Sequence, residues 1–299
     1  MGNIKIGMIG LDTSHVIAFT KLLNDSKHDH HVPGGEVVVA FPGGSDDMEF
    51  SHTRVEGFTA EMRDNFGIKI VQTPEEVANE CDAILLESVD GRVHLEQFRK
   101  IAPFGKPTFI DKPFATSSRD AKEIFQLAEQ FGTPVMSCSS LRYSEGLTAA
   151  LEEDEGGNIY GVDCYGPLAM EATHGLFWYG IHTVEMLYRA FGPGCEKVTV
   201  TKNDDHDLIV GEWKDGRIGS IRGNRIGNSS FGALIHRQKG TQFVDVDADK
   251  KPFYASLLEE IIQFFRTGKS PINYIETLEI TRFIEAANES RETGKTVKL

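Results

Sequence analysis

Lys112 has the side chain and the position that could most directly take part in chemistry. It follows a short apolar stretch rich in β-forming residues, 107–110, and precedes Pro113, so it stands where a strand ends in a turn. The carboxyl edge of an open α/β sheet is where such sheets bind ligands. Pro113 restricts Lys112 to an extended backbone conformation, and Asp111 beside it could hold or tune the charge. The sequence therefore presents Lys112 as a cation aimed at a ligand, with a solvated loop lysine as the alternative.

The elements that must position Lys112 form a regular alternation of strand-like and helical patterns. A helix is expected after Thr73, where Pro74 and Glu76 give a capping box. Six short strands alternating with helices are typical of a parallel, doubly wound sheet. The expected strands cover residues 4–9, 36–41, 68–71, 82–87, 108–110 and 134–139, and the other expected helices 14–23, 55–66, 92–101 and 117–131.

The pattern changes after about residue 140. Strand-like runs with period-two alternation then follow one another with no helix between them, so they should form an antiparallel sheet with one face packed on helices. We predict a Rossmann-type dinucleotide-binding domain over residues 1–137 and an α+β domain with a largely antiparallel open sheet, for substrate binding and oligomerisation, over 138–299. The expected strands here are 198–201, 208–213, 218–223, 231–236 and 243–246, and the helices 145–151, 177–191, 253–267 and 274–291.

The charge and composition of the chain exclude several classes of protein. A net charge of −14 argues against nucleic acid and against anionic membranes as partners. The first ten residues lack the basic start and long apolar run of a signal peptide, and no apolar stretch has transmembrane length. We expect a cytoplasmic protein with a small-molecule substrate.

The first turn carries part of a dinucleotide-binding motif. The motif requires glycine at positions 10, 12 and 15, and only Gly10 is present. Asp12 would face two phosphates unfavourably unless it turns away, for instance to cap the next helix, and His15 takes the third position. Thr13 and Ser14 could still help the helix N-terminus to hold an anion. Taken alone, this motif is weak evidence for a cofactor.

The segment after the second strand would contact the adenosine ribose. It contains Ser45, and its two carboxylates, Asp46 and Asp47, come late. No arginine follows closely to favour a 2′-phosphate. The choice between NAD and NADP therefore stays open.

Four short motifs resemble one known family. They are His94-Leu95-Glu96 after the fourth strand, Gly105-Lys106-Pro107, Asp111-Lys112-Pro113 with aspartate in place of the family's glutamate, and Gly180-x-His182. The tail from Gly268-Lys269 through Ala286-Ala287-Asn288-Glu289-Ser290 continues the match. The chain resembles the glucose–fructose oxidoreductase/inositol dehydrogenase (Gfo/Idh/MocA) family of nicotinamide-dependent oxidoreductases.

The resemblance implies roles for particular residues. Lys112 would lie between nicotinamide and substrate and bind the reacting hydroxyl, and His182 would be the general acid/base. It also implies NAD or NADP as cofactor, a sugar, polyol or related substrate, and a homodimer or homotetramer. The candidate cofactor-binding residues are Gly10, Asp12, Thr13, Ser14, His15, Ser45, Ser88, His94, Glu96 and Asp111.

The chain departs from the family pattern near the histidine. Trp178 stands where the family has the aspartate partner of that histidine, and Tyr179 or His174 could relay a proton instead. A core role for residues 177–179 is the alternative. Arg142-Tyr143 resembles the family's Arg-Phe and could meet a substrate oxygen. The candidate substrate-binding residues are Arg142, Tyr143, His174, Trp178 and Tyr179.

Metal binding is the less favoured interpretation of the histidines. His182 and Glu185, like Glu171 and His174, are spaced three apart and could hold a divalent cation. The loop with histidines at 28, 30 and 31 lacks a frame of further ligands. We therefore predict no metal.

A second hypothesis comes from a different class of function. It is a member of the family that has lost hydride transfer, and so a ligand-binding or regulatory protein or a metal-assisted lyase or hydrolase. Asp12 and Trp178 motivate it.

Overall fold

The computed structural model describes residues 2–153, 155–170 and 174–299, and the chain forms two compact units. The predicted boundary at residues 137 and 138 is close to the main division, but one boundary is not sufficient, because α9 (Phe253–Thr267) returns to the first unit. The first unit comprises Met1–Ala115, Arg119–Cys138 and Tyr254–Tyr274, and the second Thr116–Ser118, Ser139–Phe253 and Ile275–Leu299.

Side-chain packing explains why α9 joins the first unit. The Tyr254 ring meets His15 and Phe19 edge-on, with centroid distances of 5.0 and 5.5 Å. Ile262 lies so close to Gly35 that a Cβ built there would be 2.6 Å from its methyl group. This apolar contact links segments more than 200 positions apart, and no local pattern in the sequence indicates it.

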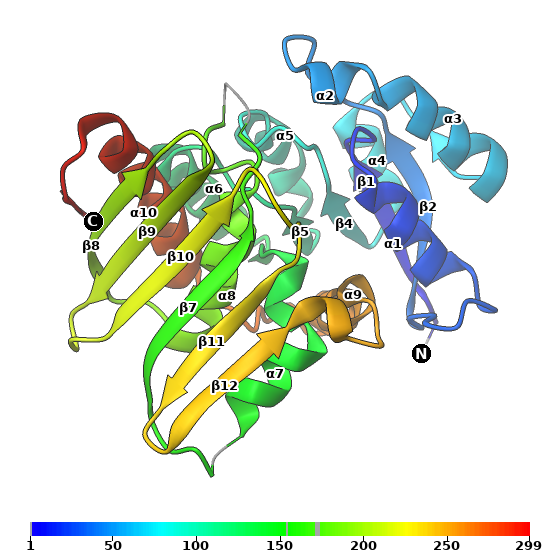
Figure 1. The fold of residues 1–299 in the computed structure, drawn as a ribbon. Coiled ribbons are helices and arrows are strands. Elements are labelled where there is room, and N and C mark those ends of the chain that lie inside the picture. Colours follow the sequence, from blue (N-terminus) through cyan, green and yellow to red (C-terminus); the bar gives the residue numbers. More distant parts are fainter. Residues whose placement is uncertain (1, 154, 171–173) are drawn as a thin grey trace. The chain divides into compact units, whose positions relative to one another are not determined.

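The first unit contains a six-stranded sheet in the order β3-β2-β1-β4-β5-β6 (Figure 1). Every neighbouring pair is parallel, as predicted. The strand order reverses between β1 and β4, which makes their carboxyl ends the expected ligand edge. The strands are β1 (Ile4–Ile9), β2 (Gly35–Phe41), β3 (Lys69–Ile70), β4 (Ala83–Leu86), β5 (Thr108–Ile110) and β6 (Val135–Met136).

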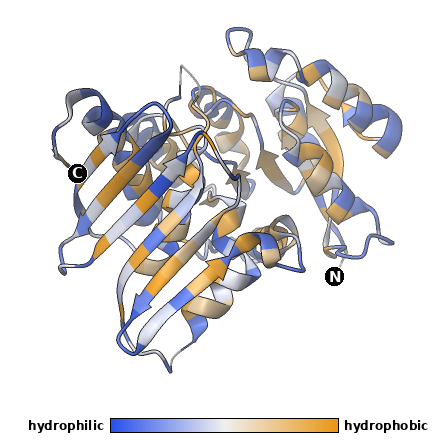
Figure 2. Cartoon of the chain, viewed as in Figure 1, coloured by the Kyte–Doolittle hydropathy of each residue, from blue (hydrophilic) through white to orange (hydrophobic). Residues whose placement is uncertain are grey.

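Helices connect these strands. The capping box is present, since Thr73 Oγ1 accepts from the Glu76 N–H and the Glu76 carboxylate accepts from the Thr73 N–H. Figure 2 shows apolar colours along β2 and β4, which are buried inside the unit. The short helix α2 was not predicted. The helices are α1 (His15–Asn24), α2 (Glu49–His52), α3 (Val55–Phe66), α4 (Pro74–Glu80), α5 (His94–Ile101), the 3₁₀ helix η1 (Ala102–Phe104) and α6 (Ser118–Phe131).

The second unit contains a seven-stranded sheet in the order β12-β11-β7-β10-β9-β8-β13. The sheet is largely antiparallel, as predicted, and one pair, β7 with β10, is parallel. The cause is α8 (Gly180–Phe191), which separates β7 from β8, so that the β8-β9-β10 meander then places β10 beside β7. The strands are β7 (Ile159–Pro167), β8 (Cys195–Lys202), β9 (His206–Trp213), β10 (Ile218–Asn224), β11 (Gly232–Arg237), β12 (Gly240–Asp245) and β13 (Val297–Lys298).

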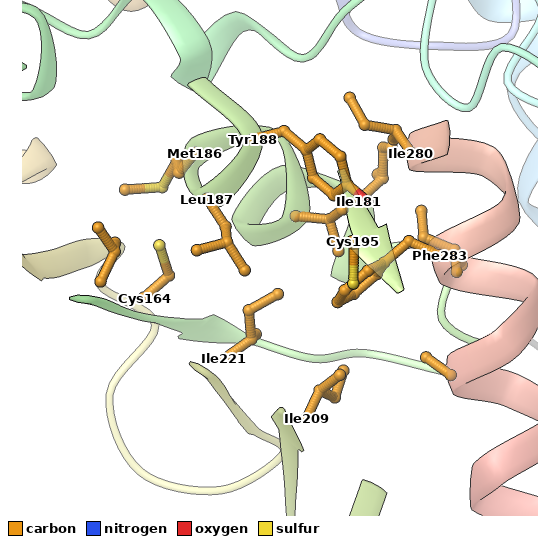
Figure 3. Close-up of a cluster of buried hydrophobic side chains, with 14 of the residues drawn as sticks. Cys164, Ile181, Met186, Leu187, Tyr188, Cys195, Ile209, Ile221, Ile280 and Phe283 are labelled. Carbon is orange, nitrogen blue, oxygen red and sulfur yellow. The ribbon is translucent and has the colours of Figure 1, made fainter. Parts of the chain in front are cut away.

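Helices pack on one face of this sheet around an apolar core. Tyr188 and Phe283 are fully buried, and their rings meet edge-on at a centroid distance of 5.7 Å (Figure 3). The Tyr188 hydroxyl donates to Glu279, so the buried phenol keeps a partner. Within the described ranges, no helix combines the length and apolarity needed to cross a bilayer. The remaining helices are η2 (Ser140–Tyr143), α7 (Glu145–Glu152), η3 (Val246–Ala248) and α10 (Tyr274–Thr293).

A buried group of charges joins η2, α8 and α10. The Arg142 guanidinium lies 3.1 Å from a Glu185 oxygen and 2.5 Å from a Glu276 oxygen. Burial raises the pKa of Glu185 to about 7, although the Arg142 charge opposes the shift. Two carboxylates on one buried guanidinium favour a structural role for Arg142.

The raised pKa of Glu185 predicts how the stability of the second unit changes with pH. The folded protein holds this proton more tightly than the unfolded chain. The stabilisation is therefore fully present below the ordinary pKa of 4.5 and is lost as the pH rises through about 7. Relative to Glu185→Gln, we expect wild type to lose on the order of 1–3 kcal/mol of unfolding free energy between about pH 5 and pH 8. Urea unfolding at each pH measures this, with the exposed Glu196→Gln as control; parallel curves for wild type and Glu185→Gln would contradict it.

Candidate functional site

Lys112 follows β5 at the carboxyl edge of the first sheet, and only 9% of its surface is exposed. Its neighbour Asp111 places a carboxylate oxygen 2.8 Å from Nδ1 of His15, the first residue of α1. Burial raises the pKa of the Asp111 carboxyl, but the charge and hydrogen bond of His15 and the charge of Lys112 outweigh it and hold the pKa below its usual value. Lys112 therefore stands beside the Asp111 carboxylate in a nearly closed environment.

Asp12 turns away from the dinucleotide turn, but it does not cap α1. One carboxylate oxygen accepts from Ser51 Oγ at 2.6 Å, and the other accepts from the Val89 N–H at 2.9 Å. The residue at the N-cap of α1 is Ser14, and its side chain makes no capping hydrogen bond. Asp12 therefore does not cap the helix, because donors on other segments engage its carboxylate, whereas Thr13 Oγ1 accepts from the N–H of His15 at 3.4 Å.

Gly10 is the one motif position at which the turn requires glycine. Its φ is +90°, a conformation that other residues rarely adopt. A Cβ there would also lie 2.4 Å from the backbone nitrogen of Ser88. The turn after β1 therefore fits closely against the segment after β4.

His94 joins the loops that follow β4 and β5. Its Nε2 lies 2.7 Å from the Ser88 carbonyl and its Nδ1 lies 3.2 Å from the Phe114 carbonyl. Complete burial lowers the pKa of His94, so we assign a neutral ring that donates to Ser88, the nearer acceptor. Ser88 in turn donates its hydroxyl to Gln97. His94 and Ser88 thus fix the loops at the sheet edge near Lys112.

The structure does not bring all the candidate cofactor residues together. Glu96 lies on the exposed side of α5 in an ion pair with Arg99 at 3.3 Å. Ser45 donates its N–H to Ser51, and its buried hydroxyl has no partner among the described residues. Thr13 is buried and Ser14 is exposed at the start of α1. Ser45 and Ser14 keep polar groups available, whereas Glu96 has no evident place in this site.

Sequence reasoning missed two charged residues near this edge. Glu87 follows β4 and is completely buried, with an oxygen 3.8 Å from His15 Nδ1. Arg92 makes a two-point contact with Asp47 and a second with Asp90. A glutamate that ends an apolar strand was a usable signal for the first residue. No local pattern indicates Arg92, because only folding brings it to Asp47 in the loop after β2.

In the second unit, His182 has a hydroxyl partner. Its Nδ1 lies 2.7 Å from Oγ of Ser139, and the rings of Tyr179 and Phe231 meet it edge-on, each at a centroid distance of 5.6 Å. Ser139 stands just before η2 and was not predicted. It fixes the orientation of the ring where the sequence suggested that a charged partner was missing.

The other candidate substrate residues are buried near His182 or in the core. Trp178 is 8% exposed and lies between the rings of His174 and Tyr179, with centroid distances of 6.3 and 6.2 Å. Tyr143 is also buried. Burial of Trp178 agrees with the core interpretation, and a substrate contact by Arg142 or Tyr143 stays a prediction.

The metal pairs considered from the sequence are not assembled in the described residues. Glu185 binds Arg142 while His182 binds Ser139, and Glu171 lies outside the residues that the structure describes. In the histidine loop, Nδ1 of His28 accepts from the His30 N–H, and Nδ1 of His31 lies 3.0 Å from the Leu22 carbonyl. These ring atoms are engaged by the loop itself and by the end of α1.

The first half of the chain is similar to known oxidoreductases in sequence. Residues 4–138 match the family model GFO_IDH_MocA, an oxidoreductase family with an NAD-binding Rossmann fold. The uncharacterised oxidoreductase YhhX of Escherichia coli (strain K12) is 30% identical over 132 residues, which are 40% of this chain and 38% of that protein. The match thus spans well under half of that relative.

Solved structures match over nearly the whole chain. A putative myo-inositol dehydrogenase from Sinorhizobium meliloti 1021 superposes with a TM-score of 0.80 at 14% identity, covering 99% of each chain. The myo-inositol dehydrogenase from Lactobacillus casei in complex with NAD(H) and myo-inositol gives 0.77 at 16% identity, covering 100% of this chain and 97% of that one. At such identities the likeness shows the fold. Residues 4–138 are thus similar to the NAD-binding Rossmann domain of the Gfo/Idh/MocA oxidoreductases, the family that the motifs around His94 and Lys112 resemble.

Proposed function

We propose that the protein is an NAD(P)-dependent oxidoreductase that transfers hydride between a nicotinamide cofactor and a CH–OH group of a sugar, polyol or related compound. The observation that carries the proposal is Lys112, a nearly buried cation at the carboxyl end of β5. It lies in a unit whose sequence matches a family with an NAD-binding Rossmann fold. No observation favours the alternative of a member that has lost hydride transfer, and the engaged carboxylate of Asp12 removes one motive for it.

The residues after β1 fit a dinucleotide. Gly10 lets the chain turn sharply at the strand end, and the Asp12 carboxylate is held by Ser51 and Val89. The N-terminus of α1 would then receive the pyrophosphate, with Thr13 and Ser14 beside it. The fit therefore depends on backbone N–H groups of the helix more than on a glycine-rich turn.

The chain's own side chains supply the acid–base chemistry. Nicotinamide supplies the hydride acceptor or donor when it is bound. The Lys112 ammonium would orient the substrate hydroxyl and stabilise the alkoxide that develops as its proton leaves. His182 would take that proton, with Ser139 holding the ring in place. This division of work requires Lys112 and His182 to reach the same substrate.

The proposal predicts that Lys112 matters for turnover more than for cofactor binding. Lys112→Ala should lower kcat/KM on a responsive polyol by about 10²–10⁴-fold, the usual range for a lost acid–base contribution. NADH binding, followed by tryptophan fluorescence, should change only a few-fold. The exposed Lys100→Ala is the matched control. Unchanged turnover in Lys112→Ala, or no cofactor binding by wild type up to millimolar concentrations, would refute the proposal.

The charges after β2 favour NAD over NADP in our proposal. A 2′-phosphate needs a free cation near this segment, and Arg92 is already paired with Asp47 and Asp90 at N–O distances of 2.7–3.1 Å. The exposed carboxylate of Asp46 adds further repulsion.

Asp47→Asn tests this preference because it releases one side of Arg92. We expect the ratio of the NADPH and NADH dissociation constants to fall about tenfold, the equivalent of one charge-assisted hydrogen bond. Asp46→Asn removes the same charge without releasing Arg92 and should have a smaller effect. Equal effects of the two variants, or tighter binding of NADPH than NADH by wild type, would contradict the assignment.

We also propose that the outer face of the second unit's sheet mediates homo-oligomer formation. Leu208, Ile218, Leu234 and Phe243 are 38–63% exposed on the strands, and Leu234 pairs with Phe243 across β11 and β12. The bands of apolar colour on these strands are visible in Figure 2. An open sheet face with large apolar side chains is typical of a subunit interface.

Charge on this face should dissociate the oligomer. We expect light scattering at about 10 µM to give a dimer or tetramer for wild type and a monomer for Phe243→Asp combined with Leu234→Asp, because an obligate interface tolerates few buried charges. Tyr274→Asp, an exposed aromatic position of the first unit, is the control. A monomeric wild type would overturn the proposal. A cytoplasmic location stays a prediction of the sequence.

A further inference from the structure

Three potential metal ligands converge at the carboxyl edge of the first sheet. They are Nδ1 of His15 and one carboxylate oxygen each of Glu87 and Asp111, and all three atoms lie within 4.8 Å of one another. The His15 nitrogen is 2.8 Å from the Asp111 oxygen and 3.8 Å from the Glu87 oxygen. The residues belong to the start of α1, the end of β4 and the end of β5, and none is more than 8% exposed.

Glu87 gives an independent indication that something else binds here. Its side chain is completely buried, and neither carboxylate oxygen has a hydrogen-bond partner among the described residues. Burying a carboxyl group without donors is costly, whether or not it is ionised. The other groups of this cluster do not supply a donor, since Asp111 already engages His15 and Asp12 engages Ser51 and Val89.

The charges around the cluster act in both directions. Burial raises the pKa of Glu87 well above its usual value, the Asp111 and Asp12 carboxylates raise it further, and the Lys112 ammonium lowers it. Lys112 therefore offsets part of the negative charge. The two Glu87 oxygens nevertheless have no hydrogen-bond partner among the described residues, and an additional ligand would supply one.

We propose that His15, Glu87 and Asp111 bind one divalent transition-metal cation, with Zn²⁺ or Mn²⁺ as the chemical type. One imidazole nitrogen with two carboxylates suits Zn²⁺, and the two carboxylates suit Mn²⁺, whereas Mg²⁺ and Ca²⁺ prefer oxygen ligands alone. Metal–ligand bonds of about 2.1 Å place neighbouring ligand atoms about 3.4 Å apart in a tetrahedral shell, within the range spanned by the two distances from His15. The ion would also balance the two carboxylate charges. The proposal does not depend on hydride transfer.

The test uses the full-length protein after treatment with a chelator. Calorimetric titration with Zn²⁺ alone and with Mn²⁺ alone should show one equivalent per chain for at least one ion. Glu87→Gln should weaken binding by more than about 100-fold, the upper end of what loss of an outer-sphere partner costs. Glu185→Gln, a buried carboxyl of the second unit, and the double variant His28→Ala with His30→Ala, which removes the loop histidines, should bind like wild type.

A second measurement covers the case in which Glu87→Gln does not fold. Co²⁺ added to wild type should give visible absorption bands that Zn²⁺ displaces at one equivalent, and His15→Gln should lose them. Absence of stoichiometric binding of every ion tested would overturn the proposal and leave a buried water as the occupant. So would loss of binding in the loop-histidine variant only.

Discussion

The Asp12 carboxylate joins the chain segments that follow β1, β2 and β4. It stands after β1, accepts from Ser51 in α2, and accepts from the Val89 backbone just after β4. A buried carboxylate with two donors at 2.6–2.9 Å is a strong and directional tie. The close approach of Gly10 to Ser88 and the His94 ring, which donates to the Ser88 carbonyl and lies 3.2 Å from the Phe114 carbonyl, extend this tie to the loop after β5. The position of Lys112 depends on that chain of contacts.

This tie also changes how the dinucleotide motif is understood. A carboxylate at the second motif position looks like a defect when only the sequence is considered, since it adds negative charge where phosphates would approach. In the fold the same carboxylate has two donors, so its charge is directed into the protein. His15, at the third position, takes the place of a packing glycine and brings an ionisable ring against Asp111. The two departures thus build a polar layer beneath the turn.

The fold was largely predictable, whereas the partners of the functional side chains were not. Apolar runs and helix signals placed β5, α3 and α9 correctly to the residue, because local periodicity fixes them. Lys112 was found because a proline and a strand end flank it. Glu87, Ser139 and Arg92 were missed because each acquires its meaning from a contact with a distant segment: His15, His182 and Asp47 lie 72, 43 and 45 positions away. The parallel pairing of β7 with β10 was missed for the same reason.

The return of α9 to the first unit has a consequence for synthesis of the chain. When the ribosome has made the first 138 residues, all six strands of the parallel sheet exist, but Tyr254 and Ile262 do not. His15, Phe19 and the start of β2 then lack the apolar surface that covers them in the finished protein. The first unit to emerge is therefore completed only after most of the second has been translated, which leaves apolar surface exposed on its nascent form and favours aggregation.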